Sequence, residues 1–125
     1  MITFVNPNYV MSTEKDVALF LREFKDKMRI WDILFRDDRG KNAQALVDLE
    51  FRPVDRKKAL EALVTQDYSE GPLEEKLYGG PDMWVFGKTI KKKEVYIKIT
   101  VGAHGSSVIC ISFHLAEHKM QYPLK

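Results

Sequence analysis

The chain has 125 residues, of which 45% are hydrophobic and 30% are charged, and its formal net charge is +2. This length predicts one domain over residues 1–125. No apolar run reaches the roughly 20 residues that a membrane helix needs, and the first residues lack the basic and apolar regions of a secretory signal. The single cysteine, Cys110, excludes an internal disulfide and favours a reducing, cytoplasmic location.

The first elements of the chain are predicted to be an arm and a helix. Residues 1–11 predict an extended arm or a short edge strand. Thr13 and Asp16 have the spacing of a capping box, with aspartate in place of glutamate. Residues 14–28 then place five apolar side chains on one helical face, which are Val17, Phe20, Leu21, Phe24 and Met28. The sequence therefore predicts a helix over residues 14–28 with one buried side.

The segment after this helix is short, β-branched and aromatic, so residues 30–35 predict a strand with Trp31 in the core. Residues 43–49 predict a short helix, and residues 56–64, capped by Asp55, predict a longer one. The first turn of the longer helix is Arg56-Lys57-Lys58, where cations oppose the helix dipole. Two interpretations stay open, because these side chains could serve a partner or form an ordinary solvated turn.

Residues 65–82 predict a mobile loop on the substrate side of the molecule. The next stretch predicts three antiparallel strands, at residues 83–90, 94–101 and 108–115. Side chains of a strand alternate between the two faces of a sheet. In the middle strand one set is Val95, Ile97, Ile99 and Val101, and the other is Glu94, Tyr96, Lys98 and Thr100. In the third strand the apolar set is Ile109, Ile111, Phe113 and Leu115, and the other is Cys110, Ser112 and His114.

These elements predict an α+β domain in which helices pack on one face, the dry face, of a mostly antiparallel sheet. Tyr96, Lys98, Ser112 and His114 are then expected on the opposite, polar face. Cys110 is expected to pack in or under the sheet rather than to act as a nucleophile.

The charges are distributed unevenly along the chain. Residues 83–125 carry seven lysines against two glutamates, a net charge of +5, which leaves −3 for residues 1–82. A basic half is what an anionic partner such as nucleic acid requires. Small soluble domains also show such a bias without an anionic partner, so both interpretations stay open.

Several kinds of site are not predicted. The chain has no glycine-rich phosphate loop and no Ser/His/Asp arrangement. Its three histidines, His104, His114 and His118, lack the spacing of a metal site, because His114 falls in a predicted strand. We therefore expect neither a metal ion nor a cofactor.

Tyr96, Lys98 and His114 form a set that is chemically sufficient to cut RNA without a metal. In that reaction the 2′-hydroxyl attacks the neighbouring phosphate and the 5′-oxygen leaves, which requires a base, an acid and a cation. Histidine can serve as the acid or the base. Lysine stabilises the phosphorane charge, and tyrosine can donate to phosphate or stack on a base.

A resemblance supports this interpretation. Asp67-Tyr68, Met83-Trp84, the strand from Val95 to Val101 and the run Ile111-Ser112-Phe113 together resemble the MqsR family of toxins. These are bacterial messenger-RNA interferases with a RelE-like fold, held inactive by a cognate antitoxin. The resemblance covers roughly residues 49–114 and implies a RelE-like fold and endoribonuclease activity for this chain.

The resemblance transfers the family's site unevenly. The strand tyrosine and lysine are kept as Tyr96 and Lys98, and the lysine that follows Ser-Phe is His114 here. The glutamine that follows the tryptophan is Val85, and the loop lysine falls near Glu70, so two functional groups are changed. The implied catalytic residues are Tyr96, His114 and Lys98. The expected RNA-binding residues are Lys88, Lys91, Lys92, Lys93, Tyr68 and Glu70.

The implied partners are a cognate antitoxin protein and mRNA, with no membrane, and with DNA only through the antitoxin. One rival hypothesis is a non-catalytic RNA- or protein-binding module on the same scaffold, which Val85 and Glu70 favour. Another is a structural domain whose lysines serve solubility alone.

Overall fold

The computed structural model describes residues 12–38, 40–77 and 79–125, so the arm predicted over residues 1–11 lies outside the described part. The helices are α1 (Glu14–Trp31), α2 (Gly40–Asp48) and α3 (Pro53–Glu61), followed by a 3-10 turn, η1 (Thr65–Asp67). The strands are β1 (Ile33–Phe35), β2 (Tyr68–Leu73), β3 (Met83–Ile90), β4 (Lys93–Thr100) and β5 (Val108–Leu115).

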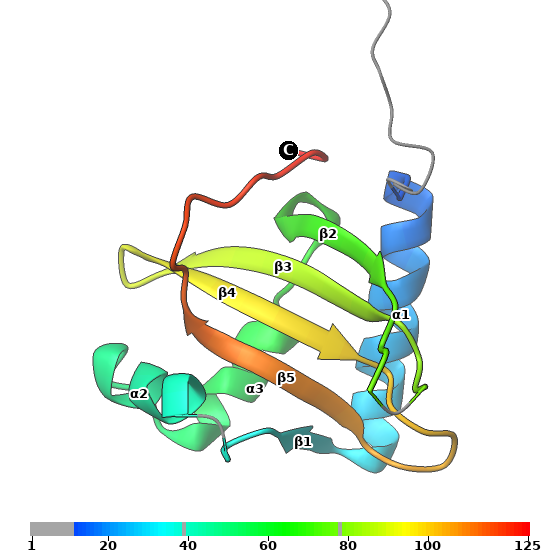
Figure 1. Ribbon diagram of the computed structural model, residues 1–125, viewed down its shortest axis with the longest axis horizontal. Coiled ribbons are helices and arrows are strands. Elements are labelled where there is room, and N and C mark those ends of the chain that lie inside the picture. Colours follow the sequence, from blue (N-terminus) through cyan, green and yellow to red (C-terminus); the bar gives the residue numbers. More distant parts are fainter. Residues whose placement is uncertain (1–11, 39, 78) are drawn as a thin grey trace, which may run out of the picture.

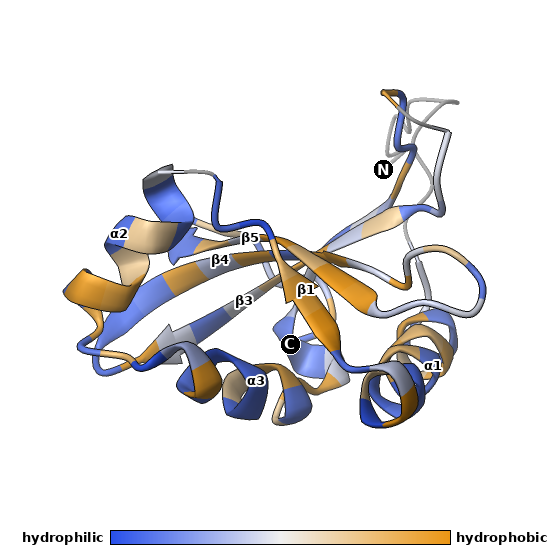
Figure 2. Ribbon diagram, turned by 90° about the horizontal axis from the view of Figure 1, so that it is seen from below, coloured by the Kyte–Doolittle hydropathy of each residue, from blue (hydrophilic) through white to orange (hydrophobic). Residues whose placement is uncertain are grey.

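The five strands form one sheet in the order β1-β5-β4-β3-β2 (Figure 1). Neighbours from β2 to β5 pair antiparallel, and β1 pairs parallel to β5. α1 and α3 lie on the same side of the sheet, and α2 packs against β5 (Figure 2). The predicted α+β class with a mostly antiparallel sheet is therefore confirmed.

The core lies between α1 and the sheet. All five residues predicted for the apolar face of α1 are buried, and they join the inward side chains of the strands, including Phe86, Ile97 and Ile99. The capping box is present, because Thr13 Oγ1 accepts from the N–H of Asp16 at 3.2 Å and the Asp16 carboxylate accepts from the N–H of Thr13 at 3.0 Å. Of the helices in the described residues, none combines the length and apolar composition that crossing a membrane requires.

The strand predicted over residues 30–35 is wrong in its first half. α1 continues to Trp31 and ends at Asp32, whose φ is 65° and whose N–H donates to Met28 O at 2.9 Å. Trp31 is therefore 50% exposed instead of lying in the core. Its β-branched and aromatic surroundings favoured a strand, but such propensity is a weak signal that tertiary packing overrides.

The helix predicted at residues 56–64 begins earlier, at Pro53, and ends at Glu61. Asp55 therefore does not precede the helix as its N-cap. It stands inside the first turn, where its carboxylate accepts from the N–H of Arg52 at 2.8 Å. Proline suits this first turn because it has no N–H to leave unpaired there.

Two of the three cations that the sequence placed in the first turn, Arg56 and Lys57, bind carboxylates of the same chain. Arg56 is 2% exposed and donates to Asp37 at 2.6 and 3.2 Å, with its guanidinium 3.8 Å from the centre of the Phe35 ring. Lys57 donates to Asp32 at 3.1 Å. Neither of the two interpretations offered above describes Arg56, which is a buried structural residue.

The loop predicted over residues 65–82 is wrong in its first half, where η1 leads into β2. This strand pairs with β3 through an irregular register, in which Tyr68, Glu70 and Leu73 face Phe86, Val85 and Met83. Gly71 and Pro72 masked the strand in the sequence, because proline is tolerated only at the edge of a sheet or at an irregularity.

The alternation predicted for β5 is interrupted by a β-bulge. Lys98 of β4 pairs with Ser112, whereas the next residue, Ile99, pairs with Cys110, so Ile111 is an extra residue on β5. Residues before the bulge consequently face the opposite way from the prediction. Cys110 is fully buried in the core, as expected for a packed thiol, while Ile109 points away from the core.

Candidate functional site

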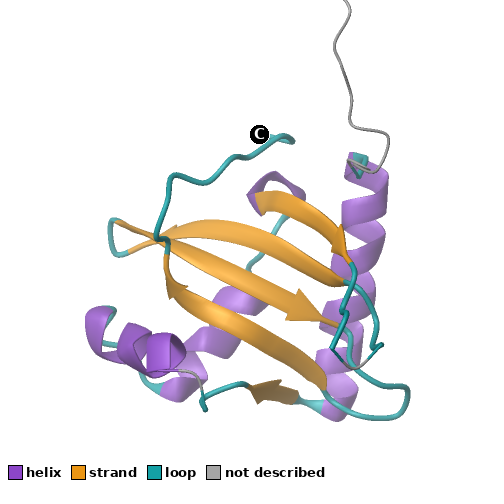
Figure 3. Ribbon diagram, viewed as in Figure 1, coloured by secondary structure: helices purple, strands orange, loops and turns teal. Residues whose placement is uncertain are grey.

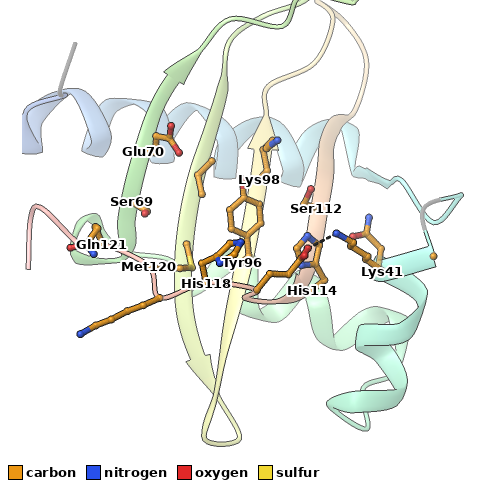
Figure 4. Close-up of a pocket in the computed structure, with 15 residues that line it drawn as sticks. Lys41, Ser69, Glu70, Tyr96, Lys98, Ser112, His114, His118, Met120 and Gln121 are labelled. Atoms are coloured by element: carbon orange, nitrogen blue, oxygen red, sulfur yellow. Dashed lines mark hydrogen bonds and ion pairs between the residues drawn. The ribbon is translucent and has the colours of Figure 1, made fainter. Parts of the chain in front are cut away.

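A hollow of about 920 Å³ lies on the face of the sheet that α1 and α3 leave open (Figure 4). Its lining comes from β2, β3, β4 and β5, from the start of α2, and from the segment that follows β5. The predicted polar face is confirmed here, because Tyr96, Lys98, Ser112 and His114 all line this hollow.

The pairing of the strands arranges the lining in two rows across the sheet. One row runs through Glu70, Val85, Lys98 and Ser112, and the other through Gly87, Tyr96 and His114. Directly opposite side chains on adjacent strands lie within contact distance. The sheet itself therefore positions Lys98, Tyr96 and His114 next to one another.

Tyr96 and His114 stack, with ring centres 5.2 Å apart and an angle of 15° between the rings. The ammonium of Lys98 lies 6.0 Å from the centre of the Tyr96 ring. Burial first, and the Glu70 carboxylate second, raise the pKa of Tyr96. The hydroxyl therefore keeps its proton at neutral pH and can donate a hydrogen bond to an anionic ligand.

The tautomer of His114 follows from its one hydrogen bond to the backbone. Nδ1 lies 2.9 Å from the carbonyl oxygen of Leu115. A carbonyl oxygen only accepts hydrogen bonds, so Nδ1 carries the hydrogen, and in the neutral ring Nε2 then bears the lone pair. His114 is thus prepared to accept a proton at Nε2.

Asn42 holds the bulge of β5 in place and was missed in the sequence. It is 2% exposed, its Nδ2 donates to the carbonyls of Arg36 and Ile111 at 2.9 Å, and its Oδ1 accepts from the N–H of Phe113 at 3.0 Å. These bonds join α2 to the backbone of β5 at the bulge and to the segment that follows β1. The only sequence signal was a polar residue just before the helix predicted at residues 43–49, which is too common to single out Asn42; α2 in fact runs from Gly40 to Asp48 and includes it.

The segment after β5, residues 116–125, forms one wall of the hollow, which sequence reasoning also missed. We call it the C-terminal segment. It runs back across the sheet as loop (Figure 3), and residues 117–121 line the hollow. An ion pair between Glu117 and Lys41 connects it to α2 (Figure 4).

Three of the expected RNA-binding lysines lie in the β3–β4 hairpin and away from the hollow. Lys91 donates to the carbonyl of Leu49 at 2.8 Å, and Lys93 donates to that of Asp48 at 2.9 Å. Lys92 is exposed in the turn with a φ of 69°. None of the three is among the residues that line the hollow.

Two more expected residues face the other side of the sheet. Lys88 of β3 pairs with Val95 of β4, a core residue, and its ammonium lies 3.7 Å from the carboxylate of Asp67. Tyr68 is completely buried, and its hydroxyl donates to Gly71 O at 2.6 Å. Of the expected RNA-binding residues, only Glu70 shares the hollow with Tyr96, Lys98 and His114.

The fold and this hollow define a small α+β domain with an open sheet face that carries cations, imidazoles and carboxylates together. Within the described residues, no three histidine, cysteine or acidic side chains are grouped closely enough to hold a metal ion. The chain matches no protein-family model, no curated protein and no solved structure.

Proposed function

We propose that this protein is the toxin of a toxin–antitoxin pair, a cytoplasmic endoribonuclease with a RelE-like fold that resembles the MqsR family. It cuts single-stranded mRNA without a metal ion and is inhibited by a cognate antitoxin. The observation that carries the proposal is the adjacency of Lys98, Tyr96 and His114 in one accessible hollow of the sheet.

In the proposed reaction each of the three side chains has a separate chemical role. Nε2 of His114 takes the proton of the 2′-hydroxyl as that oxygen attacks phosphorus. Lys98 stabilises the charge of the phosphorane, and the protonated hydroxyl of Tyr96 donates to a phosphate oxygen. The bond from phosphorus to the 5′-oxygen breaks, the 5′-oxygen takes up a proton to become a hydroxyl, and a 2′,3′-cyclic phosphate remains on the other fragment.

The test is cleavage of a long single-stranded transcript in excess chelator, with the cut sites mapped by primer extension. The wild-type protein is expected to give discrete cuts. His114→Ala is expected to slow cutting by at least about 100-fold, since proton transfer contributes that much or more. Tyr96→Phe is expected to slow it by about 10-fold or more, the effect of losing one hydrogen bond to a charged group.

His104→Ala is the matched control, because His104 is exposed in the loop before β5 and does not line the hollow. Unchanged cutting in His114→Ala and Tyr96→Phe would refute the site assignment. An intact transcript with the wild-type protein would refute the nuclease.

A second candidate is a non-catalytic RNA- or protein-binding module on the same scaffold. It is favoured by Val85, which is buried in the hollow and offers no polar group, and by the negative charge of Glu70 beside it. Its signature is RNA binding that weakens steeply with added salt while no product forms.

A further inference from the structure

The proposed reaction needs a second proton-transfer group, because the 5′-oxygen must gain a proton as it leaves. The strands supply one imidazole, that of His114. The C-terminal segment brings another, His118, into the same hollow. Figure 4 shows both imidazoles at the same end of the hollow, away from Glu70 and Lys98.

The carboxylate of Glu117 interacts electrostatically with both imidazoles. It is ion-paired with Lys41, and that ammonium first, then His114 and His118, hold the pKa of Glu117 below its usual range. Both imidazoles are thus close enough to one carboxylate to act on it electrostatically.

The C-terminal segment is held in place by Glu94 of β4. The Glu94 carboxylate accepts from the hydroxyl of Tyr122 at 2.8 Å and from the N–H of Met120 at 3.3 Å. Its carbonyl accepts from the N–H of Ala116 at 2.8 Å. His118 therefore lies between two anchored residues, Ala116 and Met120.

Gly87 of β3 makes room for this segment. A Cβ at Gly87 would lie 2.3 Å from the Tyr122 hydroxyl and 2.8 Å from Met120 Sδ. Glycine inside a strand commonly marks a place where another part of the chain approaches closely. The C-terminal segment therefore packs closely against the sheet, and a side chain at position 87 would displace it.

We propose that His118 is the general acid of this site, acting opposite His114 as the general base. This inference rests on the proposed function. The proton of the 2′-hydroxyl goes to Nε2 of His114, and the imidazolium of His118 gives its proton to the 5′-oxygen as the phosphorus–oxygen bond breaks. His114 ends protonated and His118 neutral, and exchange with water restores both.

The experiment uses two forms of one single-stranded oligoribonucleotide that contains a mapped cut site. One form is natural RNA, and in the other a sulfur atom replaces the 5′-oxygen at the cut site. A thiolate leaves without needing a proton, so the sulfur form bypasses the general acid but not the general base. Values of kcat/KM are measured for both forms with the full chain.

His118→Ala is expected to lower kcat/KM on natural RNA by about 100-fold or more while remaining within about 10-fold of wild type on the sulfur form. His114→Ala is expected to be impaired on both forms. Gly87→Ala, which displaces the segment, is expected to follow the pattern of His118→Ala. Its matched control is Gly80→Ala, where the nearest atom to an added Cβ is a carboxylate oxygen of Glu75 at 3.4 Å.

The possible failures are distinguishable. If His118→Ala cuts natural RNA as well as wild type, or is equally impaired on the sulfur form, then His118 is not the general acid. If the wild-type protein cuts neither form, the proposed function itself is refuted, and this inference with it.

Discussion

At the scale of single residues, two buried polar side chains, Asn42 and Arg56, stabilise the packing of the chain through their hydrogen bonds. Asn42 makes three hydrogen bonds to the backbone of β5 and of the segment after β1. Arg56 is almost completely buried and neutralised by Asp37, which is half exposed. Asn42 lines the hollow, but its amide is bonded to backbone, and Arg56 is bonded to the Asp37 side chain away from the hollow.

Asn42→Ala is expected to lower the free energy of unfolding by about 2–3 kcal/mol, because it leaves buried backbone donors and acceptors without partners. Urea denaturation followed by circular dichroism measures this change. Gln44→Ala is the control on the same helix, because its exposed bond to Asp48 is worth only about 0.5 kcal/mol or less. Equal effects of the two substitutions would show that Asn42 does not support the bulge.

At the scale of elements, the start of α1 and the bulge of β5 determine which face of the sheet is covered and which side chains face the hollow. The capping box sets where α1 begins, and its apolar face then fixes the helix on the dry side of the sheet. The bulge turns the end of β5 so that Ser112 and His114 face the hollow while Cys110 stays in the core.

Thr13→Ala is expected to lower the free energy of unfolding by about 1 kcal/mol, the usual effect of removing an N-cap side chain. Thermal unfolding of the variant measures it. Thr13→Ser, which keeps a capping hydroxyl, is expected to stay close to wild type. A Thr13→Ser variant as unstable as Thr13→Ala would mean that the methyl group, and not the hydrogen bond, matters at this position.

At the scale of the whole molecule, several carboxylates are stabilised in their charged form. Hydrogen bonds from the backbone and hydroxyl of Thr13 lower the pKa of Asp16, and a bond from Lys57 lowers the pKa of Asp32. Bonds from Arg52 lower the pKa of Asp55, and a bond from Lys41 lowers that of Glu117. A carboxylate whose pKa is lower in the folded state contributes stability above its unfolded pKa.

That contribution is lost as pH falls through the lowered, folded pKa values. Near neutral pH these groups are therefore expected to make a constant contribution to the free energy of unfolding. When the pH drops below about 4, the range in which unperturbed carboxyl groups titrate, the free energy of unfolding is expected to decrease. Urea denaturation at a series of pH values measures this. Replacing Asp32 by Asn should flatten the decline, and an unchanged slope would show that the charged carboxylate of Asp32, bonded to Lys57 and to the N–H of Ile33, contributes nothing.

The sequence by itself determined α1, the meander from β3 to β5 and the polar face with Tyr96, Lys98 and His114. These features depend on local periodicity and capping, which a single chain displays directly. It did not reveal β2, since Gly71 and Pro72 disguise an edge strand, nor the continuation of α1 to Trp31.

The tertiary structure alone decided which candidate residues share the hollow. The face of Lys88, the burial of Tyr68 and the attachment of Lys91 and Lys93 to the end of α2 all depend on strand register and on contacts between segments distant in the chain. The position of His118 likewise depends on Glu94 and Gly87 receiving the C-terminal segment. Such long-range pairing leaves no periodic signal in the sequence, because it is set by the packing of the whole domain.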